Sequence, residues 1–303
     1  MQKTRKYAIL LGGYLQKEKD FMKTLYISDL DGTLLDNSGH ISENSLAILN
    51  HLSEKGLLFS IATARSIMTA RDLLGALRLN APIVLMNGVF LFDLKANKAV
   101  RYHEIDEKSL DAVLSVFSAH NKTPLLFLFG DDGLLSIFYT ELRLKVQQDF
   151  YAQREKSFAG RFRRVERLFV PERQHAVYVN LVDLYEELAP VAEALKAIPG
   201  VAFSFYSDTY SPYWFLEVYA ASASKANGAL EVKKMTGADR IAAFGDNLND
   251  LSLFACADET YAVANAVDEV KRCATAVIQS NEEDGVAAFL LQKFSEKSID
   301  NEG

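Results

Sequence analysis

The chain has 303 residues, of which 49% are hydrophobic and 24% are charged, and its formal net charge is -7. These proportions are typical of a folded globular protein and exclude a largely disordered chain. The acidic balance argues against nucleic acid and an anionic membrane as main partners, because both attract basic surfaces. Cys256 and Cys273 form no CxxC pair, so the sequence indicates neither a disulfide framework nor a thiolate zinc site and fits a reducing cytoplasm.

The first 21 residues place basic side chains before a short apolar run, YAILLGGYL, which two glycines interrupt. No small-residue cleavage site follows this run, so a signal peptide is disfavoured. We interpret residues 1–21 as an N-terminal extension upstream of Met22 that has no role in the fold. No apolar run in the chain has the length of a membrane-spanning helix.

From Thr24 onwards, short apolar segments alternate with amphipathic ones. A helix is predicted from Ser42, a candidate N-cap, to Gly56, where the chain can turn. A second helix places Ile67 and Leu77 on one apolar face. Strands are predicted around these helices at the segment that enters YISDLDGTLL, at LLFSIAT and at IVLMNG. This order, βαβαβ, is typical of a parallel sheet with both faces covered by helices.

The pattern changes near residue 93. The segment LLFLFGDDGLLSIFY predicts a hairpin around a Gly-Asp-Asp-Gly turn, and helices are predicted around Leu110–Phe117 and Leu188–Ile198. These elements indicate a separate α+β unit. The only dense group of arginines lies at 161–167 and is interpreted as solvated surface, with an anion contact as the alternative.

After Trp214 the earlier pattern returns. SKANGAL opens a helix, RIAAFGD and AVIQ predict strands, and DGVAAFLLQKF predicts a final helix. The expected fold class is therefore α/β, a Rossmann-like parallel-sheet core with an inserted α+β cap domain. The core is expected at residues 22–92 and 215–303 and the cap at 93–214. Trp214 and Phe215, at this junction, are expected either to line a pocket or to pack in the core.

Polar residues gather at the predicted ends of the strands. Because the carboxyl ends of parallel strands meet at one edge of a sheet, these side chains are expected to lie together. Oxygen ligands suit Mg²⁺, and cationic side chains suit a phosphate. In order along the chain the residues are Asp29, Asp31, Thr63, Arg65, Asn87, Lys225, Asp246, Asn249 and Asp250.

Asp29 and Asp31 are the first of these acids. In a strand, residues i and i+2 point to the same face, so the two carboxylates are expected side by side. Two like charges at close range are costly unless a cation or a shared proton relieves them. Gly32 then allows the backbone to turn. The segment therefore predicts a cation site at the end of the first strand.

The segments DLDGT, TAR and FGDNLNDLSLF, together with the isolated Lys225, resemble the four motifs of the haloacid dehalogenase superfamily of phosphatases. AVANA and SNEEDGVA resemble the closing segments of its Cof-like branch. The resemblance covers roughly residues 24–293. It implies a C2-type cap and Mg²⁺-dependent hydrolysis of sugar phosphates or other small phosphorylated metabolites. The run Lys-Ala-Asn-Gly departs from the Lys-Gly that is common in relatives, which leaves the local backbone path open.

The resemblance also implies roles for single residues. Asp29 is implied as the nucleophile that forms an aspartyl phosphate, and Asp31 as the general acid and base. Asp29, the backbone carbonyl of Asp31 and Asp246 are implied to hold Mg²⁺, with Asp250 supporting the metal. The residues implied to contact phosphate or substrate are Thr63, Arg65, Asn87, Lys225 and Asn249.

Two alternatives to hydrolysis remain open at this stage. A phosphotransferase or mutase of the phosphomannomutase type shares DxDGT, and the arginines at 161–167 keep it under consideration. A non-catalytic binding protein on the same fold is the other, although all the expected carboxylates are present. The sequence indicates neither the leaving group nor the oligomeric state, because specificity resides in cap residues that follow no general rule.

Overall fold

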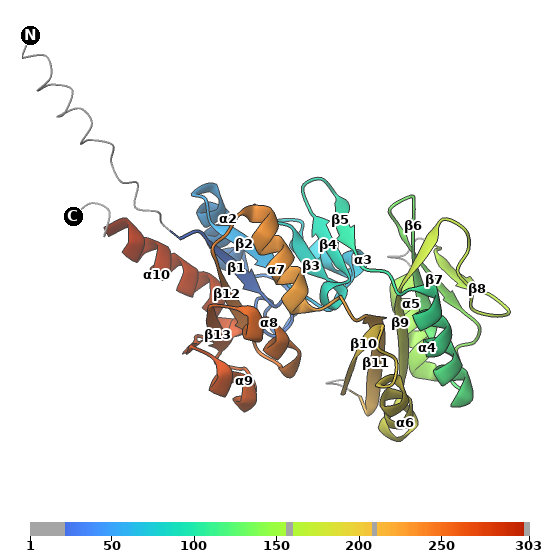
Figure 1. Cartoon of the computed structure of the whole chain (residues 1–303). Coiled ribbons are helices and arrows are strands. Elements are labelled where there is room, and N and C mark those ends of the chain that lie inside the picture. Colours follow the sequence, from blue (N-terminus) through green and yellow to red (C-terminus); the bar gives the residue numbers. More distant parts are fainter. Residues whose placement is uncertain (1–21, 156–159, 208–210, 300–303) are drawn as a thin grey trace, which may run out of the picture.

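The structure is a computed structural model that describes residues 22–155, 160–207 and 211–299 (Figure 1). The expected extension, residues 1–21, lies outside the described residues. Among the described residues, no helix has the length and apolar character needed to cross a membrane.

A parallel sheet forms the centre of the core, and its strands come from both ends of the chain. Its strands run in the order β14-β13-β12-β1-β2, and each neighbouring pair is parallel. The alternating pattern of strands and helices therefore gives the α/β class that the sequence predicts. The strand bounds are β1 (Thr24–Ser28), β2 (Leu58–Ile61), β12 (Arg240–Gly245), β13 (Glu259–Val263) and β14 (Ala276–Ile278).

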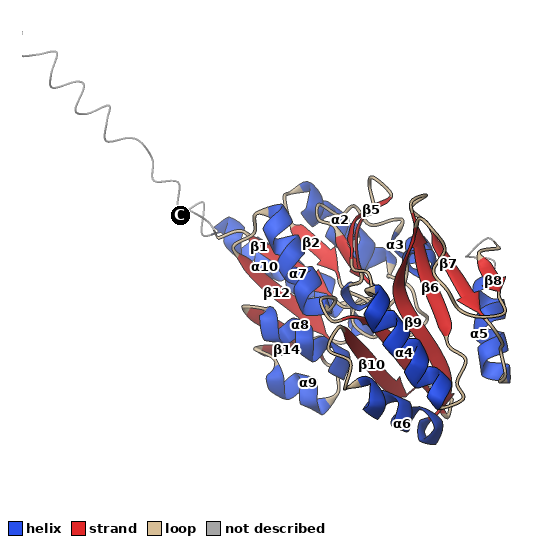
Figure 2. Cartoon of the chain, turned by 45° about the vertical axis from the view of Figure 1, so that its right-hand side comes forward, coloured by secondary structure: helices blue, strands red, loops and turns tan. Residues whose placement is uncertain are grey.

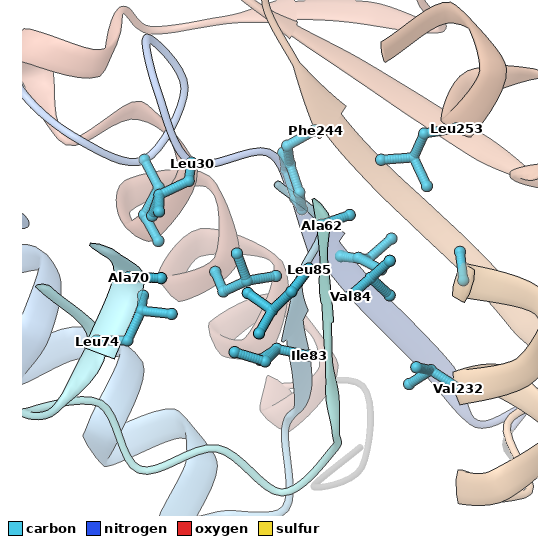
Figure 3. Packing of buried hydrophobic residues seen from close by; sticks show 14 of the residues in the cluster. Leu30, Ala62, Ala70, Leu74, Ile83, Val84, Leu85, Val232, Phe244 and Leu253 are labelled. Atoms are coloured by element: carbon cyan, nitrogen blue, oxygen red, sulfur yellow. The ribbon is translucent and has the colours of Figure 1, made fainter. Parts of the chain in front are cut away.

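Helices cover this sheet. Successive residues of β1 and β12 are buried, and because successive side chains point to opposite faces, both faces of the sheet are covered. Figure 3 shows how Phe244 and Leu253 pack in this core with side chains of the neighbouring elements. The helices are α2 (Glu43–Glu54), α3 (Ile67–Leu74), α7 (Lys225–Thr236), α8 (Leu251–Cys256), α9 (Asp268–Cys273) and α10 (Gly285–Ile299).

A small antiparallel sheet extends the core. It contains β3 (Ile83–Leu85), β4 (Phe90–Asp93) and β5 (Lys98–Tyr102) in that order. A parallel bridge from Ala62 to Val84 connects it to the end of β2. Because β4 pairs with β3 and β5 pairs with β4, β5 belongs to this sheet although it lies beyond the expected boundary at residue 93.

The inserted part is built on a second sheet, with strand order β10-β11-β9-β6-β7-β8. The predicted hairpin is β6 and β7, which pair in antiparallel register. Helices α4 and α6 lie against one face of this sheet (Figure 2). The bounds are α4 (Glu107–Ala119), β6 (Leu125–Gly130), β7 (Leu135–Tyr139), α5 (Lys145–Glu155), β8 (Phe162–Arg164), β9 (Gln174–Leu184), α6 (Tyr185–Leu195), β10 (Val201–Ser207) and β11 (Tyr213–Ala220).

The expected boundary at 214 falls inside β11, which pairs with β9 and β10. We therefore propose that the cap begins after β5 and ends after β11. Local sequence pattern does not separate these cases, because an antiparallel hairpin attached to the core has the same alternation as one in the cap.

Helix α7 packs closely on β3 through Gly228. A Cβ atom added at Gly228 would lie 2.4 Å from Cγ1 of Val84, which is far inside van der Waals contact. The glycine of the run Lys-Ala-Asn-Gly therefore allows the helix to approach the strand.

We expect Gly228→Ala to destabilise the protein by about 1–3 kcal/mol, because the new methyl group overpacks this contact. An unconstrained glycine-to-alanine change inside a helix stabilises by about 0.5–1 kcal/mol, so the sign is diagnostic. Urea unfolding measures the effect. In a Val84→Ala background the same change should cost less, since the methyl groups that it meets are gone. Equal costs in the two backgrounds would contradict the contact.

Candidate active site

Asp29 follows β1 directly and is buried. Its N–H donates to the carbonyl of Phe244 at 3.0 Å, so the pairing of β1 with β12 continues to this residue. The chain then turns, and Gly32 adopts a φ of 79°. A Cβ atom at Gly32 would lie 2.5 Å from Oδ2 of Asp246, so only glycine fits here.

Asp31 does not share a strand face with Asp29, because β1 ends at Ser28 and both acids lie beyond it. The side chain of Asp31 is 52% exposed and accepts two hydrogen bonds from Arg65, 2.8 Å from Nε and 2.6 Å from Nη2. The expectation that the two carboxylates lie side by side on one strand was therefore wrong. Asp31 has a cationic partner of its own.

Lys225 is the partner of Asp29. It is the first residue of α7, whose N-cap Ser224 accepts a hydrogen bond from the N–H of Asn227. Its ammonium group donates to Oδ1 of Asp29 and, at 2.7 Å, to Oδ1 of Asp250. The Lys225 side chain is 1% exposed. A buried positive charge thus lies between two buried carboxylates.

Asp250 holds the loop after β12 in place. Its Oδ2 accepts hydrogen bonds from the N–H groups of Asp246 at 3.0 Å and Asn247 at 3.2 Å. Asp246 is positioned further by the hydroxyl of Thr33, which donates to its Oδ1 at 2.9 Å. Both oxygens of Asp250 are therefore engaged within the protein, whereas no hydrogen bond to Oδ2 of Asp29 or Asp246 is found among the described residues.

Burial of these acids shifts their proton affinities. Burial raises the pKa of Asp29 well above its usual range, the charge of Asp250 adds to this, and Lys225 opposes it. Burial and the charge of Asp250 raise the pKa of Asp246 to about 6. Burial by itself lowers the pKa of Lys225, but the charges of Asp250 and Asp29 outweigh it and raise that pKa above its usual value.

A divalent cation fits this group. Asp29, Asp246 and Asp250 each offer an oxygen, and these atoms lie within 4.8 Å of one another. Three carboxylates and the one ammonium of Lys225 leave an excess of two negative charges among these described side chains. Carboxylate oxygens are hard ligands that suit Mg²⁺. Asp29 and Asp246 have the free oxygens, and the side chain of Asp31 is not in the group.

The remaining expected residues lie around this centre. Thr63 is buried, and its hydroxyl accepts a hydrogen bond from the N–H of Arg65 at 3.1 Å. Asn249 is exposed and lies three residues after Asp246 in the chain. Asn87 is buried, and its Nδ2 donates to Oε2 of Glu217 on β11 at 3.4 Å. Asn87 therefore connects the end of β3 to the cap sheet.

Two neighbouring cavities separate the core from the cap. One, of about 600 Å³, is lined on the core side by Asp29, Thr63 and Asn249 and on the cap side by Trp214 and Phe215. The other, of about 420 Å³, begins at Asp31 and Arg65 and extends along the cap sheet. Trp214 also packs against Tyr185 and Phe205, with ring centroids 4.8 and 4.7 Å apart. It thus combines both of the roles considered for it.

Sequence reasoning missed the polar residues of the cap sheet. Asn180 and Glu217 line the smaller cavity, and both are buried. Burial raises the pKa of Glu217 to about 7, while the nearby hydroxyls of Tyr178 and Tyr206 and the charge of Arg154 oppose the shift. The available signal was a single polar residue inside an apolar strand, in YVNLV and FLEVY.

The arginine cluster lies away from this centre. Arg163, Arg164 and Arg167 are exposed, and Arg161 forms an ion pair with Asp132 at 2.8 Å. None of them lines either of the two cavities described here. The interpretation as solvated surface agrees with these positions.

Comparison with known proteins gives consistent matches. A family model described as haloacid dehalogenase-like hydrolase matches residues 26–290. The chain is 27% identical over 294 residues to the Bacillus subtilis 5-amino-6-(5-phospho-D-ribitylamino)uracil phosphatase YitU, covering 88% of this chain and 96% of that protein. A second Bacillus subtilis protein with the same phosphatase description, YwtE, is 28% identical over 294 residues, covering 90% of this chain and 99% of that protein. A solved haloacid dehalogenase-like hydrolase from Bacteroides thetaiotaomicron has a TM-score of 0.69 at 23% identity, with 90% and 99% covered.

Glu217 yields a prediction about stability. Its pKa of about 7 in the folded chain lies above the ordinary value of 4.5, so its favourable contribution is complete below that ordinary value and is lost as the pH rises through 7. Glu217→Gln should therefore raise the melting temperature relative to wild type at pH 8 and change it less at pH 5. At pH 8 the free energy of unfolding should increase by about 3 kcal/mol at most.

Asp183→Asn is the matched control for this change. Asp183 lies on β9 and forms an ion pair with Lys122 at 2.8 Å, so its neutralisation should lower stability at pH 8. If the melting temperatures of Glu217→Gln and wild type differ by the same amount at pH 5 and pH 8, that result would contradict the raised pKa of Glu217. Other buried acids are common to both chains and cancel in the comparison.

Proposed function

The chain belongs to the haloacid dehalogenase-like hydrolase family and is a phosphatase, and we propose that it hydrolyses a small phosphomonoester with Mg²⁺ through an aspartyl phosphate on Asp29. The observation that carries this proposal is the buried Asp29, hydrogen-bonded to Lys225 and facing the larger cavity. A carboxylate in this position can attack a phosphorus atom in the cavity, while the ammonium stabilises charge on the transferred group.

The residues divide the proposed reaction between them. Oδ2 of Asp29 forms a bond to phosphorus as the bond to the leaving oxygen breaks, and Asp31 gives that oxygen a proton. Thr63, Lys225 and Asn249 hold the phosphoryl oxygens. A water molecule then attacks phosphorus, gives its proton to Asp31, and restores the Asp29 carboxylate as free phosphate forms. Mg²⁺ held by Asp29 and Asp246, with the Asp31 carbonyl, would supply positive charge that offsets the excess negative charge.

Arg65 holds the carboxylate of Asp31, the proposed general acid. Both oxygens of Asp31 accept hydrogen bonds from Arg65, and both residues line the smaller cavity. Proton transfer requires that one of these oxygens be released toward the leaving group. We therefore propose that Arg65 positions Asp31 and contacts the substrate.

Sugar phosphates and related phosphorylated metabolites are the proposed substrates. YitU and YwtE are named for a phosphorylated ribitylamino compound, so sugar and polyol phosphates are the first compounds to assay. The arginines at 161–167, which kept the mutase alternative under consideration, line neither of the two cavities between core and cap, and this favours hydrolysis. Both cysteines are free thiols, and we propose that the reaction takes place in the cytoplasm.

Metal removal tests the proposed cofactor. Excess chelator should abolish phosphate release and Mg²⁺ should restore it, because the carboxylates must be neutralised before an anionic phosphate approaches. Mg²⁺ should also raise the melting temperature more at pH 7.5 than at pH 5, since Asp246 has a pKa of about 6 and must lose its proton to bind metal. Full activity in excess chelator would refute the metal assignment.

Substitution of the two acids tests their separate roles. Asp29→Asn should leave no phosphorylated protein on incubation with substrate, because the nucleophile is gone. Asp31→Asn should slow turnover by about 10²–10⁴-fold. With an activated aryl phosphate, whose leaving group needs little protonation, Asp31→Asn should accumulate the aspartyl phosphate, which mass spectrometry detects.

Asp132→Asn is a matched control, since Asp132 is an exposed acid of the cap that pairs with Arg161. It should turn over at the wild-type rate. Wild-type turnover of a sugar phosphate by Asp31→Asn would exclude the acid and base role. Transfer of the phosphoryl group to an added sugar phosphate faster than to water would establish the mutase reaction instead.

A further inference from the structure

One face of the cap sheet carries buried polar side chains. Asn180 of β9 lies directly opposite Glu217 of β11, which in turn lies opposite Ser204 of β10. Directly paired residues of antiparallel strands point to the same face. Alternate positions on these strands add Tyr178 and Phe215 to this face. The row therefore crosses three neighbouring strands.

The opposite face of the same sheet is apolar. Leu181, Leu216 and Val218 pack there in one cluster with side chains of α4 and α6. A hydrophobic sheet face covered by helices accounts for the stability of the cap. The row of polar residues instead borders the smaller cavity, which begins at Asp31 and Arg65.

Asn180 and Glu217 are costly in these positions. Asn180 is 2% exposed, and its Oδ1 has no hydrogen-bond partner among the described residues. Glu217 is buried and accepts a hydrogen bond from Asn87 at 3.4 Å, the hydroxyl groups of Tyr178 and Tyr206 also interact with it, and it takes part in no ion pair that the described residues contain. A buried acceptor without a partner is unfavourable, so a ligand that supplies donors would relieve Asn180, and the carboxyl group of Glu217 has the capacity to accept a further hydrogen bond from the same ligand.

The other walls of the cavity are aromatic and cationic. Tyr206 and Phe215 stack with centroids 5.5 Å apart and an interplanar angle of 14°. The guanidinium group of Arg154, on α5, lies 3.6 Å from the ring centroid of Phe150. In the part of the chain that the structure describes, Arg154 has no ion pair with a carboxylate. Away from Asp31 and Arg65, the cavity thus offers acceptors, the cationic donor Arg154 and flat apolar surfaces.

We propose that this cavity binds the leaving group of the substrate and selects one with hydroxyl or N–H donors at the end far from the phosphate. Asn180 and Glu217 accept hydrogen bonds from these donors, and Arg154 donates to an oxygen of the same group. This proposal rests on the proposed phosphatase function. It assigns the preference for polyol-type phosphates to named cap residues.

The test uses two substrates of equal chain length. Ribitol 5-phosphate carries hydroxyl donors, and pentyl phosphate carries none. Wild-type protein with Mg²⁺ should show the higher kcat/KM for ribitol 5-phosphate. Asn180→Leu and Glu217→Leu should each lower the ratio of the two kcat/KM values by about 10-fold or more, because each change removes an acceptor for the hydroxyl groups, whereas the apolar substrate makes no hydrogen bond that could be lost. A cooperative thermal transition verifies that each variant is folded.

Asp183→Asn is the matched control, because it removes a carboxylate from β9 at a position that lines neither of the two cavities. It should keep the wild-type ratio. A ratio that is unchanged in both cavity variants would overturn the assignment of the cavity, and so would a wild-type preference for pentyl phosphate. Failure of the wild type to hydrolyse 4-nitrophenyl phosphate with Mg²⁺ would instead overturn the proposed function, and the cavity assignment with it.

Discussion

Lys225 places a buried positive charge between Asp29 and Asp250, and much of the molecule is organised around it. The two carboxylates would repel each other without the ammonium group, and neither is accessible enough for water to relieve them. The contact joins the ends of β1 and β12 to the first turn of α7. Because α7 begins where the chain returns from the cap, the contact of Lys225 with Asp29 and Asp250 also holds the end of the inserted part beside the site.

The loop after β3 makes a second connection between core and cap. Met86 and Asn87 have φ angles of 50° and 54°, and Gly88 has 98°. Such angles are costly for residues with a Cβ, so the surrounding structure has to impose them. A Cβ at Gly88 would lie 2.2 Å from the carbonyl oxygen of Ser224, which shows how closely the loop approaches α7. In this conformation Asn87 donates a hydrogen bond to Glu217 in the smaller cavity, while the next residue, Gly88, contacts the N-terminus of α7, where Lys225 lies.

The extent to which the sequence predicts this site depends on the kind of information required. Asp29, Thr63 and Asp246 follow predicted strands, and parallel strands bring their carboxyl ends to one edge, so their proximity was predictable. The separation of the Asp31 side chain from that of Asp29 was not predictable, because it depends on the end of β1 at Ser28, before both acids. The pairing of Asn180 with Glu217 was also inaccessible, since cross-strand register is a property of the folded sheet.

Buried carboxylates serve two different ends in this chain. Asp29 and Asp246 lie within reach of further carboxylate oxygens and of Lys225, so a divalent cation can complete their charge balance. Glu217 is not in this group of acids, and the groups that act on it are the phenolic hydroxyls of Tyr178 and Tyr206, the amide of Asn87 and the charge of Arg154. A cation bound beside Glu217 would face its single carboxylate and the guanidinium group of Arg154, which is an unfavourable charge balance. In the proposed reaction, Asp29 and Asp246 would therefore serve metal and phosphoryl chemistry, and Glu217 would serve as a hydrogen-bond acceptor for the substrate, so that reaction and selection are separated within one cleft.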